Sequence, residues 1–208
     1  MRLLNVFRRS DPDEAASRSL HDSPARSSAS DHNATGLELM RRQLYREALD
    51  EFRRDLRVRP NRAETHYNMG VTFQHLSESE KAVECFERAI RLDPEFVEAY
   101  TSLSTTFSEM GKGLAAIKSC LQAIRIAPGH LDAHNNLALA YFHWGSYPEA
   151  VKACRKALAI DPNYLSAYYT LGLIHIDLGE KDKALEQYRI LKVADPALAD
   201  YLLGQIPK

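Results

Sequence analysis

The chain has 208 residues, of which 45% are hydrophobic and 26% are charged, and its formal net charge at pH 7 is −1. These values are ordinary for a soluble globular protein, and the absence of a basic excess argues against nucleic acid as its partner. No apolar run approaches the roughly 20 residues that a membrane-spanning helix needs. We therefore expect a folded protein with a polar surface.

Residues 1–28 differ in composition from the rest and are predicted to be a disordered tail, because they are polar, rich in Ser and Pro, and lack periodicity. The first nine residues combine apolar Leu3, Leu4 and Phe7 with three arginines. One interpretation is a weak membrane-surface or docking peptide, and the other is an unstructured start with no specific role.

Two residue types recur with a constant period of 34 over the rest of the chain. The prolines are Pro60, Pro94, Pro128, Pro162 and Pro196, and the alanines are Ala48, Ala82, Ala116, Ala150 and Ala184. A fixed period of this length indicates an array of stacked supersecondary units. We divide the array into five repeats, at 29–62, 63–96, 97–130, 131–164 and 165–196.

The fourth repeat shows the expected internal structure most clearly. Apolar residues spaced by three and four predict one helix over 131–144, and Gly145 interrupts the pattern. Pro148 opens a second helix, and the residue before Pro162 is disfavoured in a helix, which ends it there. Each repeat is therefore predicted to be a helix–turn–helix unit, with Trp144 in the core.

Small residues are expected to let these helices approach closely. The recurring alanines lie early in each second helix, and Gly70 and Gly172 lie in first helices. Cys85, Cys120 and Cys154 fall within helical patterns, so we interpret them as small buried hydrophobic residues of a protein from a reducing, cytoplasmic compartment. Residues 197–208 are predicted to form a capping helix and tail that cover the last repeat.

These positions resemble the pattern of the tetratricopeptide repeat family. The fifth repeat matches best, through Tyr168, Leu171, Gly172, Ala184, Tyr188 and Pro196. The resemblance implies an all-α fold, a right-handed α-solenoid with a C-terminal capping helix, whose first helices line a concave, peptide-binding groove. The first repeat departs most, since His32 and Thr35 replace an aromatic residue and Leu, so its first helix is expected to be short.

We find no pattern that predicts catalysis. The sequence has no glycine-rich phosphate loop, no nucleophile elbow and no cysteine pair at metal-ligand spacing. His32, His66 and His134 recur at one repeat position, which favours structural roles over metal binding. We therefore expect no cofactor, no metal and no enzymatic activity.

The groove expected from the resemblance can be assigned by repeat position. The sixth position carries Asn68, Ser102, Asn136 and Thr170, a polar line similar to the asparagine ladder in the repeats of O-linked N-acetylglucosamine transferases. Such a line can bind the backbone of an extended peptide. The remaining candidate site residues are Tyr67, Thr101, Asn135 and Tyr169 at the fifth position, and an apolar patch of Leu139, Phe142, Leu173 and Ile176, which the alternative interpretation packs between repeats.

The second position of the repeat suggests the character of the partner. Glu64, Glu98 and Asp132 make this edge of the groove acidic, so a basic or amphipathic peptide is expected. The leading interpretation is a protein–protein interaction adaptor or scaffold. The alternative is a structural assembly or membrane-surface protein that self-associates through its repeats. Nucleic-acid binding through residues 41–62 is disfavoured, because the arginines there alternate with acidic residues.

Overall fold

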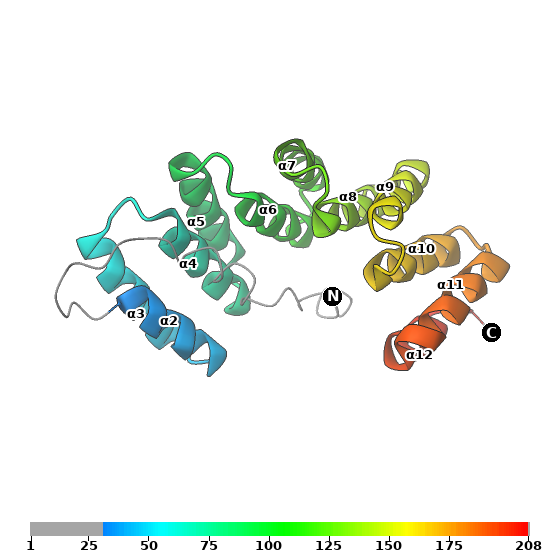
Figure 1. Cartoon of the computed structure of the whole chain (residues 1–208), viewed down its shortest axis with the longest axis horizontal. Coiled ribbons are helices and arrows are strands. Elements are labelled where there is room, and N and C mark those ends of the chain that lie inside the picture. The colour runs from blue at the N-terminus through cyan, green and yellow to red at the C-terminus, as the bar shows by residue number, and fades with distance from the viewer. Residues whose placement is uncertain (1–30, 208) are drawn as a thin grey trace. The chain divides into compact units, whose positions relative to one another are not determined.

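The computed structural model describes residues 31–207, and the predicted tail over residues 1–28 lies outside them (Figure 1). The described residues form helices and no strands. In chain order they are α2 (His32–Arg41), α3 (Tyr45–Val58), α4 (Ala63–His75), α5 (Ser79–Leu92), α6 (Val97–Glu109), α7 (Gly113–Ile126), α8 (Leu131–His143), α9 (Tyr147–Ile160), α10 (Leu165–Asp177), α11 (Lys181–Ala194) and α12 (Pro196–Leu203).

Each repeat contributes two of these helices, with α12 added at the end. The chain divides into two compact units, the first ending at Glu109 and the second beginning at Met110. In the first unit, α4 packs against α2, α3, α5 and α6. In the second, α8 contacts α7, α9 and α10, while α12 covers α10 and α11. None of the helices within the described residues is long and apolar enough to cross a membrane.

Small residues bring the helices together as expected. The five recurring alanines are all fully buried. A Cβ atom on Gly70 would lie 2.5 Å from the ring of Phe86, so only glycine permits this contact. Gly172 makes room for a different element, because its Cβ would lie 2.5 Å from Leu202 of the capping helix α12.

The turn after each first helix uses a left-handed residue at the same repeat position. Gly111, Gly145 and Gly179 have φ angles of 71°, 81° and 72°, while Gln43 and Ser77 have φ angles of 61° and 59°. Glycine adopts this conformation without strain, whereas other residues are disfavoured there. The turn geometry therefore repeats even where its preferred residue is missing.

Two sequence predictions about single elements have different outcomes. The first helix of the first repeat is short, as expected, with 10 residues against 13 in α4. The prediction that Trp144 is a core residue is wrong, since 52% of it is exposed. It caps the C-terminus of α8, and its ring rests on Gly113, whose Cβ would lie 2.6 Å away.

Candidate peptide-binding surface

In the first unit, the polar sixth-position residues hydrogen-bond to the preceding repeat. The Asn68 side-chain N–H of α4 donates to the Asn33 side-chain oxygen of α2, at 3.0 Å. The Ser102 hydroxyl of α6 donates to the Tyr67 hydroxyl of α4, at 3.5 Å. Both bonds join the sixth position of one repeat to the fifth position of the repeat before it. The predicted ladder therefore connects neighbouring first helices.

The second unit contains the same connection in a buried form. The Thr170 hydroxyl of α10 donates to the Asn135 side-chain oxygen of α8, at 2.9 Å. Thr170 is fully buried and Asn135 is only 2% exposed. In a low-dielectric interior such a bond is costly to break, because a buried polar atom then loses its partner. Here the ladder stabilises the stacking of α8 and α10.

Burial removes four of the predicted site residues from contact with a ligand. Thr101, Asn135, Tyr169 and Thr170 are all at most 9% exposed. The expectation that all twelve candidates line an accessible surface is therefore not met for these four. The other eight are partly exposed: Tyr67, Asn68, Ser102, Asn136, Leu139, Phe142, Leu173 and Ile176.

The partly exposed apolar residues lie on two first helices that contact each other. Leu139 and Phe142 belong to α8, and Leu173 and Ile176 belong to α10. The Phe142 ring packs beside Tyr147, with the ring centroids 6.0 Å apart. We call Leu139, Phe142, Leu173 and Ile176, together with the neighbouring Asn136, the α8–α10 face.

The equivalent positions of the first unit are more polar. Gln74 of α4 occupies the repeat position of Phe142, and its amide donates to the Thr106 hydroxyl of α6 at 2.8 Å. Ser108 in α6 is the other equivalent of Phe142, and Thr105 is the equivalent of Leu139. An amphipathic ligand would therefore find its largest apolar contact on the α8–α10 face.

The acidic edge expected from the sequence is largely engaged within the protein. Asp132 accepts a hydrogen bond of 2.5 Å from the Tyr164 hydroxyl, and burial raises the pKa of that hydroxyl. Glu64 lies 3.8 Å from the Arg62 guanidinium. These contacts occupy one oxygen of Asp132 and place a cation beside Glu64.

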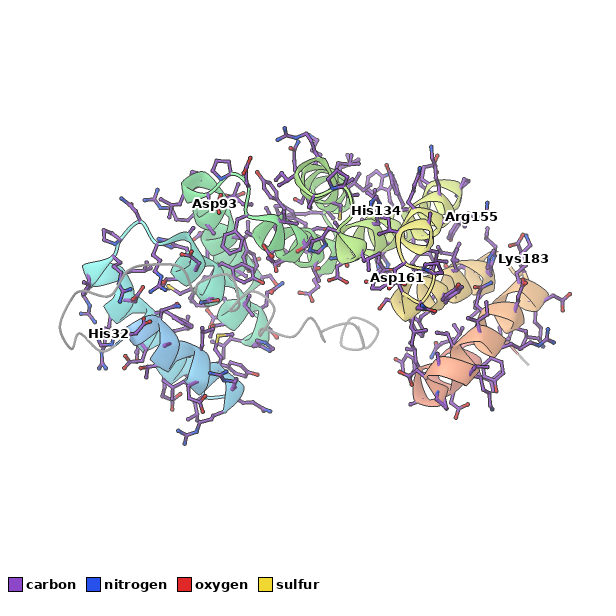
Figure 2. All side chains as sticks on the ribbon, in the orientation of Figure 1. His32, Asp93, His134, Arg155, Asp161 and Lys183 are labelled. Carbon is purple, nitrogen blue, oxygen red and sulfur yellow. The ribbon has the colours of Figure 1, made fainter. Side chains whose placement is uncertain are left out.

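The structure shows the contacts of two members of the histidine column, for which the sequence favoured structural roles. A ring nitrogen of His66 lies 3.2 Å from the carbonyl oxygen of Pro60. His134, which is labelled in Figure 2, makes the same contact with Pro128 at 2.9 Å. Tyr168 follows the pattern, since its hydroxyl donates to the Pro162 carbonyl at 3.0 Å. The fourth residue of these repeats thus anchors the linker that precedes it. The 34-residue recurrence of hydrogen-bonding rings was the available signal.

Sequence reasoning also missed a buried carboxylate between the first two repeats. Asp55 of α3 is fully buried and accepts a hydrogen bond of 2.6 Å from the Thr65 hydroxyl of α4. The guanidinium groups of Arg59 and Arg62 lie 3.4 and 3.5 Å from its other oxygen. The equivalent positions in later repeats carry Ala89, Ala123, Ala157 and Leu191, so the departure from that apolar column was the signal.

The remaining chemistry offers no reactive group at this surface. Burial raises the pKa of the Cys85 thiol to about 11 and that of Cys154 to about 12, so neither forms the nucleophilic thiolate near neutral pH. Within residues 31–207, no group of three or more His, Cys, Asp or Glu side chains could hold a metal ion. The α8–α10 face offers apolar side chains and the amide of Asn136.

The comparisons agree with this arrangement. Tetratricopeptide repeat profiles match residues 63–96, 97–130, 131–164 and 153–186. A structure of MamA has a TM-score of 0.68 at 25% identity, over 80% of this chain and 97% of that one. The protein TTC0263 of Thermus thermophilus, described as a thermophilic TPR protein, gives 0.69 at 22% identity, over 84% and 96%.

YrrB, described as a TPR protein with an unusual peptide-binding site, gives a TM-score of 0.64 at 19% identity, over 91% of this chain and 95% of that one. The sequence search of curated proteins found no match. The profile matches and the all-helical fold together lead to one conclusion. The chain belongs to the tetratricopeptide repeat family and is a helical solenoid of the kind that serves as a protein-interaction scaffold.

Proposed function

We propose that the chain is a non-enzymatic adaptor that binds an amphipathic peptide segment of a partner protein on the α8–α10 face. The observation that carries the proposal is the pair of contacting first helices with four partly exposed apolar side chains, Leu139, Phe142, Leu173 and Ile176. Partly exposed aliphatic and aromatic side chains on adjacent helices are the usual receptor for the apolar residues of a peptide. Asn136, on the same helix as Leu139, can orient the ligand backbone.

The internal hydrogen bonds of the ladder support this assignment of roles. Thr170 and Asn135 are committed to each other, so they hold α8 and α10 in register and leave recognition to the apolar side chains. The four apolar side chains of this face favour an amphipathic ligand over a purely basic one.

The proposal can be tested by selecting ligands from a displayed library of random short peptides with the full chain. Enriched peptides should carry aliphatic or aromatic residues at spacings that fit one face. The double variant L139S/I176S should weaken their binding at least tenfold, because it removes apolar contacts from both helices. The matched control L114S/L121S makes the same chemical change on α7 and should bind as the wild type does. Equal binding by all three proteins would remove this face from the account.

A further inference from the structure

The outward surface of α7 and α9 is chemically unlike that of α5, a second helix of the first unit. Exposed residues on α7 and α9 include five cations, Lys118, Arg125, Lys152, Arg155 and Lys156, and one carboxylate, Glu149. On α5 the exposed charged residues are instead Glu80, Lys81, Glu84, Glu87 and Arg91, a mixture with more acid than base. The outward surface of α7 and α9 therefore has a positive charge that α5 lacks.

The cations of this surface form no ion pair with a carboxylate of the described residues. Within the described chain, no carboxylate lies within ion-pair distance of Lys118, Lys152, Arg155 or Lys156, and the Arg125 guanidinium donates to the neutral Gln122. By contrast, Arg53 and Arg54 on α3 form ion pairs with Asp50 and Glu51, at 2.9 and 2.5 Å. Cations without a carboxylate partner remain available for an anionic ligand.

Exposed aliphatic side chains lie among these cations. Leu114 and Leu121 of α7 are 58% and 46% exposed, and Ile160 of α9 is 45% exposed. Positions 114, 118, 121 and 125 of α7 are the repeat equivalents of 148, 152, 155 and 159 of α9, so they lie on the same side of their repeats. Figure 1 shows both helices on the upper side of α8.

The α9 part of this surface contains an open hollow that suits a charged headgroup. Its volume is about 310 Å³, and it is lined by Pro148, Val151, Lys152, Arg155, Lys156 and Ala159. Arg155 is marked on α9 in Figure 2. Three cations around an apolar floor can surround a phosphodiester group while its glycerol backbone rests on Val151 and Ala159.

We infer that the outward surface of α7 and α9 binds an anionic phospholipid bilayer. Basic residues interspersed with exposed aliphatic side chains are typical of protein surfaces that associate with membranes, where cations attract anionic headgroups and aliphatic side chains insert beside them. An acidic protein would need carboxylates and apolar pockets in matching positions, whereas an anionic bilayer offers both chemistries everywhere. This surface is separate from the α8–α10 face, so a membrane-bound chain could still bind a peptide.

Co-sedimentation of the full chain with vesicles tests the inference. The wild type should sediment with vesicles of equimolar phosphatidylcholine and phosphatidylglycerol, remain in solution with phosphatidylcholine alone, and dissociate as the salt concentration rises. The variant K118Q/K152Q/R155Q/K156Q replaces four cations that have no carboxylate partner. Its partition coefficient for the anionic vesicles should be at least tenfold lower than that of the wild type. The L114S/L121S variant should lower it several-fold.

A control on α3 and α5 removes the same number of positive charges from cations that form ion pairs, in the variant R53Q/R54Q/K81Q/R91Q, and should partition within about twofold of the wild type. Circular dichroism of each variant establishes that it is folded. The inference is overturned if the wild type does not sediment with anionic vesicles, or if the ion-pair control and the α7–α9 variant lose binding equally. It is also overturned if the wild type binds soluble polyglutamate but no vesicle, since the ligand would then be an acidic polypeptide.

Discussion

Replacing Thr170 with valine tests the conclusion that the polar ladder stabilises the repeat stack. Valine has nearly the same shape, so the substitution removes the hydroxyl donor and leaves the Asn135 oxygen, 2% exposed, without that bond. A buried acceptor without its partner costs about 1–3 kcal/mol. At about 2 kcal/mol and roughly 2–4 °C per kcal/mol for a chain of this size, the melting temperature should fall by about 4–8 °C.

The measurement is thermal unfolding followed by circular dichroism. Thr35→Val is the matched control, because the Thr35 hydroxyl is exposed and donates only to the Asp31 carbonyl at 3.3 Å, so the expected change is below about 0.5 kcal/mol. Peptide affinity of the T170V protein should be unchanged below its melting temperature. A melting temperature equal to that of T35V, or lost peptide binding at unchanged stability, would refute the assigned role of Thr170.

Three further predictions concern local packing and protonation. Ser77→Gly should raise the free energy of unfolding by roughly 0.5–1 kcal/mol, because Ser77 has a φ of 59° that glycine adopts without strain. Urea titration measures this change, and an unchanged unfolding midpoint would contradict the prediction. Gly70→Ala should destabilise the chain by about 1–3 kcal/mol, since the new Cβ would lie 2.5 Å from the Phe86 ring. In the control Gly129→Ala the new Cβ meets no atom within 4 Å, so the free energy of unfolding should hardly change. Similar losses of stability for both variants would refute the packing argument. Desolvation lowers the pKa of His66 below its ordinary value of 6.5, so the unfolded chain takes up the proton first and stability should fall as the pH drops below about 6.5. The melting temperature of His66→Gln should depend less on pH over this window, and identical profiles would exclude His66 as a contributor.

The periodic positions predicted most of the fold. The proline ladder placed the repeat boundaries close to the helix ends, because the residue before proline leaves the helical region whatever its tertiary surroundings. The buried alanines and Gly70 were also predictable, since helix approach depends on side-chain size at a fixed register. The exposure of Trp144 was not predictable from its repeat position, because that position does not show that the residue lies at the end of α8.

The exposure of the candidate site residues was predicted less completely, because it depends on contacts between repeats. Sequence position put Asn68 and Thr170 in one column, yet Asn68 is partly exposed and Thr170 is fully buried. The difference arises from the residues around each position, and a periodic pattern does not contain that information. The hydrogen bonds between sixth and fifth positions join polar residues that are 35 apart in the sequence. This spacing was visible in the sequence, but its meaning depends on how adjacent first helices pack.

The central claim is that the α8–α10 face is the peptide-binding surface. Its most direct test is a nuclear magnetic resonance titration of the isotope-labelled full chain with a peptide selected by the wild type. We expect the largest saturable shifts of amide resonances on α8 and α10, around Leu139, Phe142, Leu173 and Ile176. These shifts should vanish in the L139S/I176S variant. Saturable shifts on α7, α9 or the helices of the first unit, with α8 and α10 unperturbed, would contradict it.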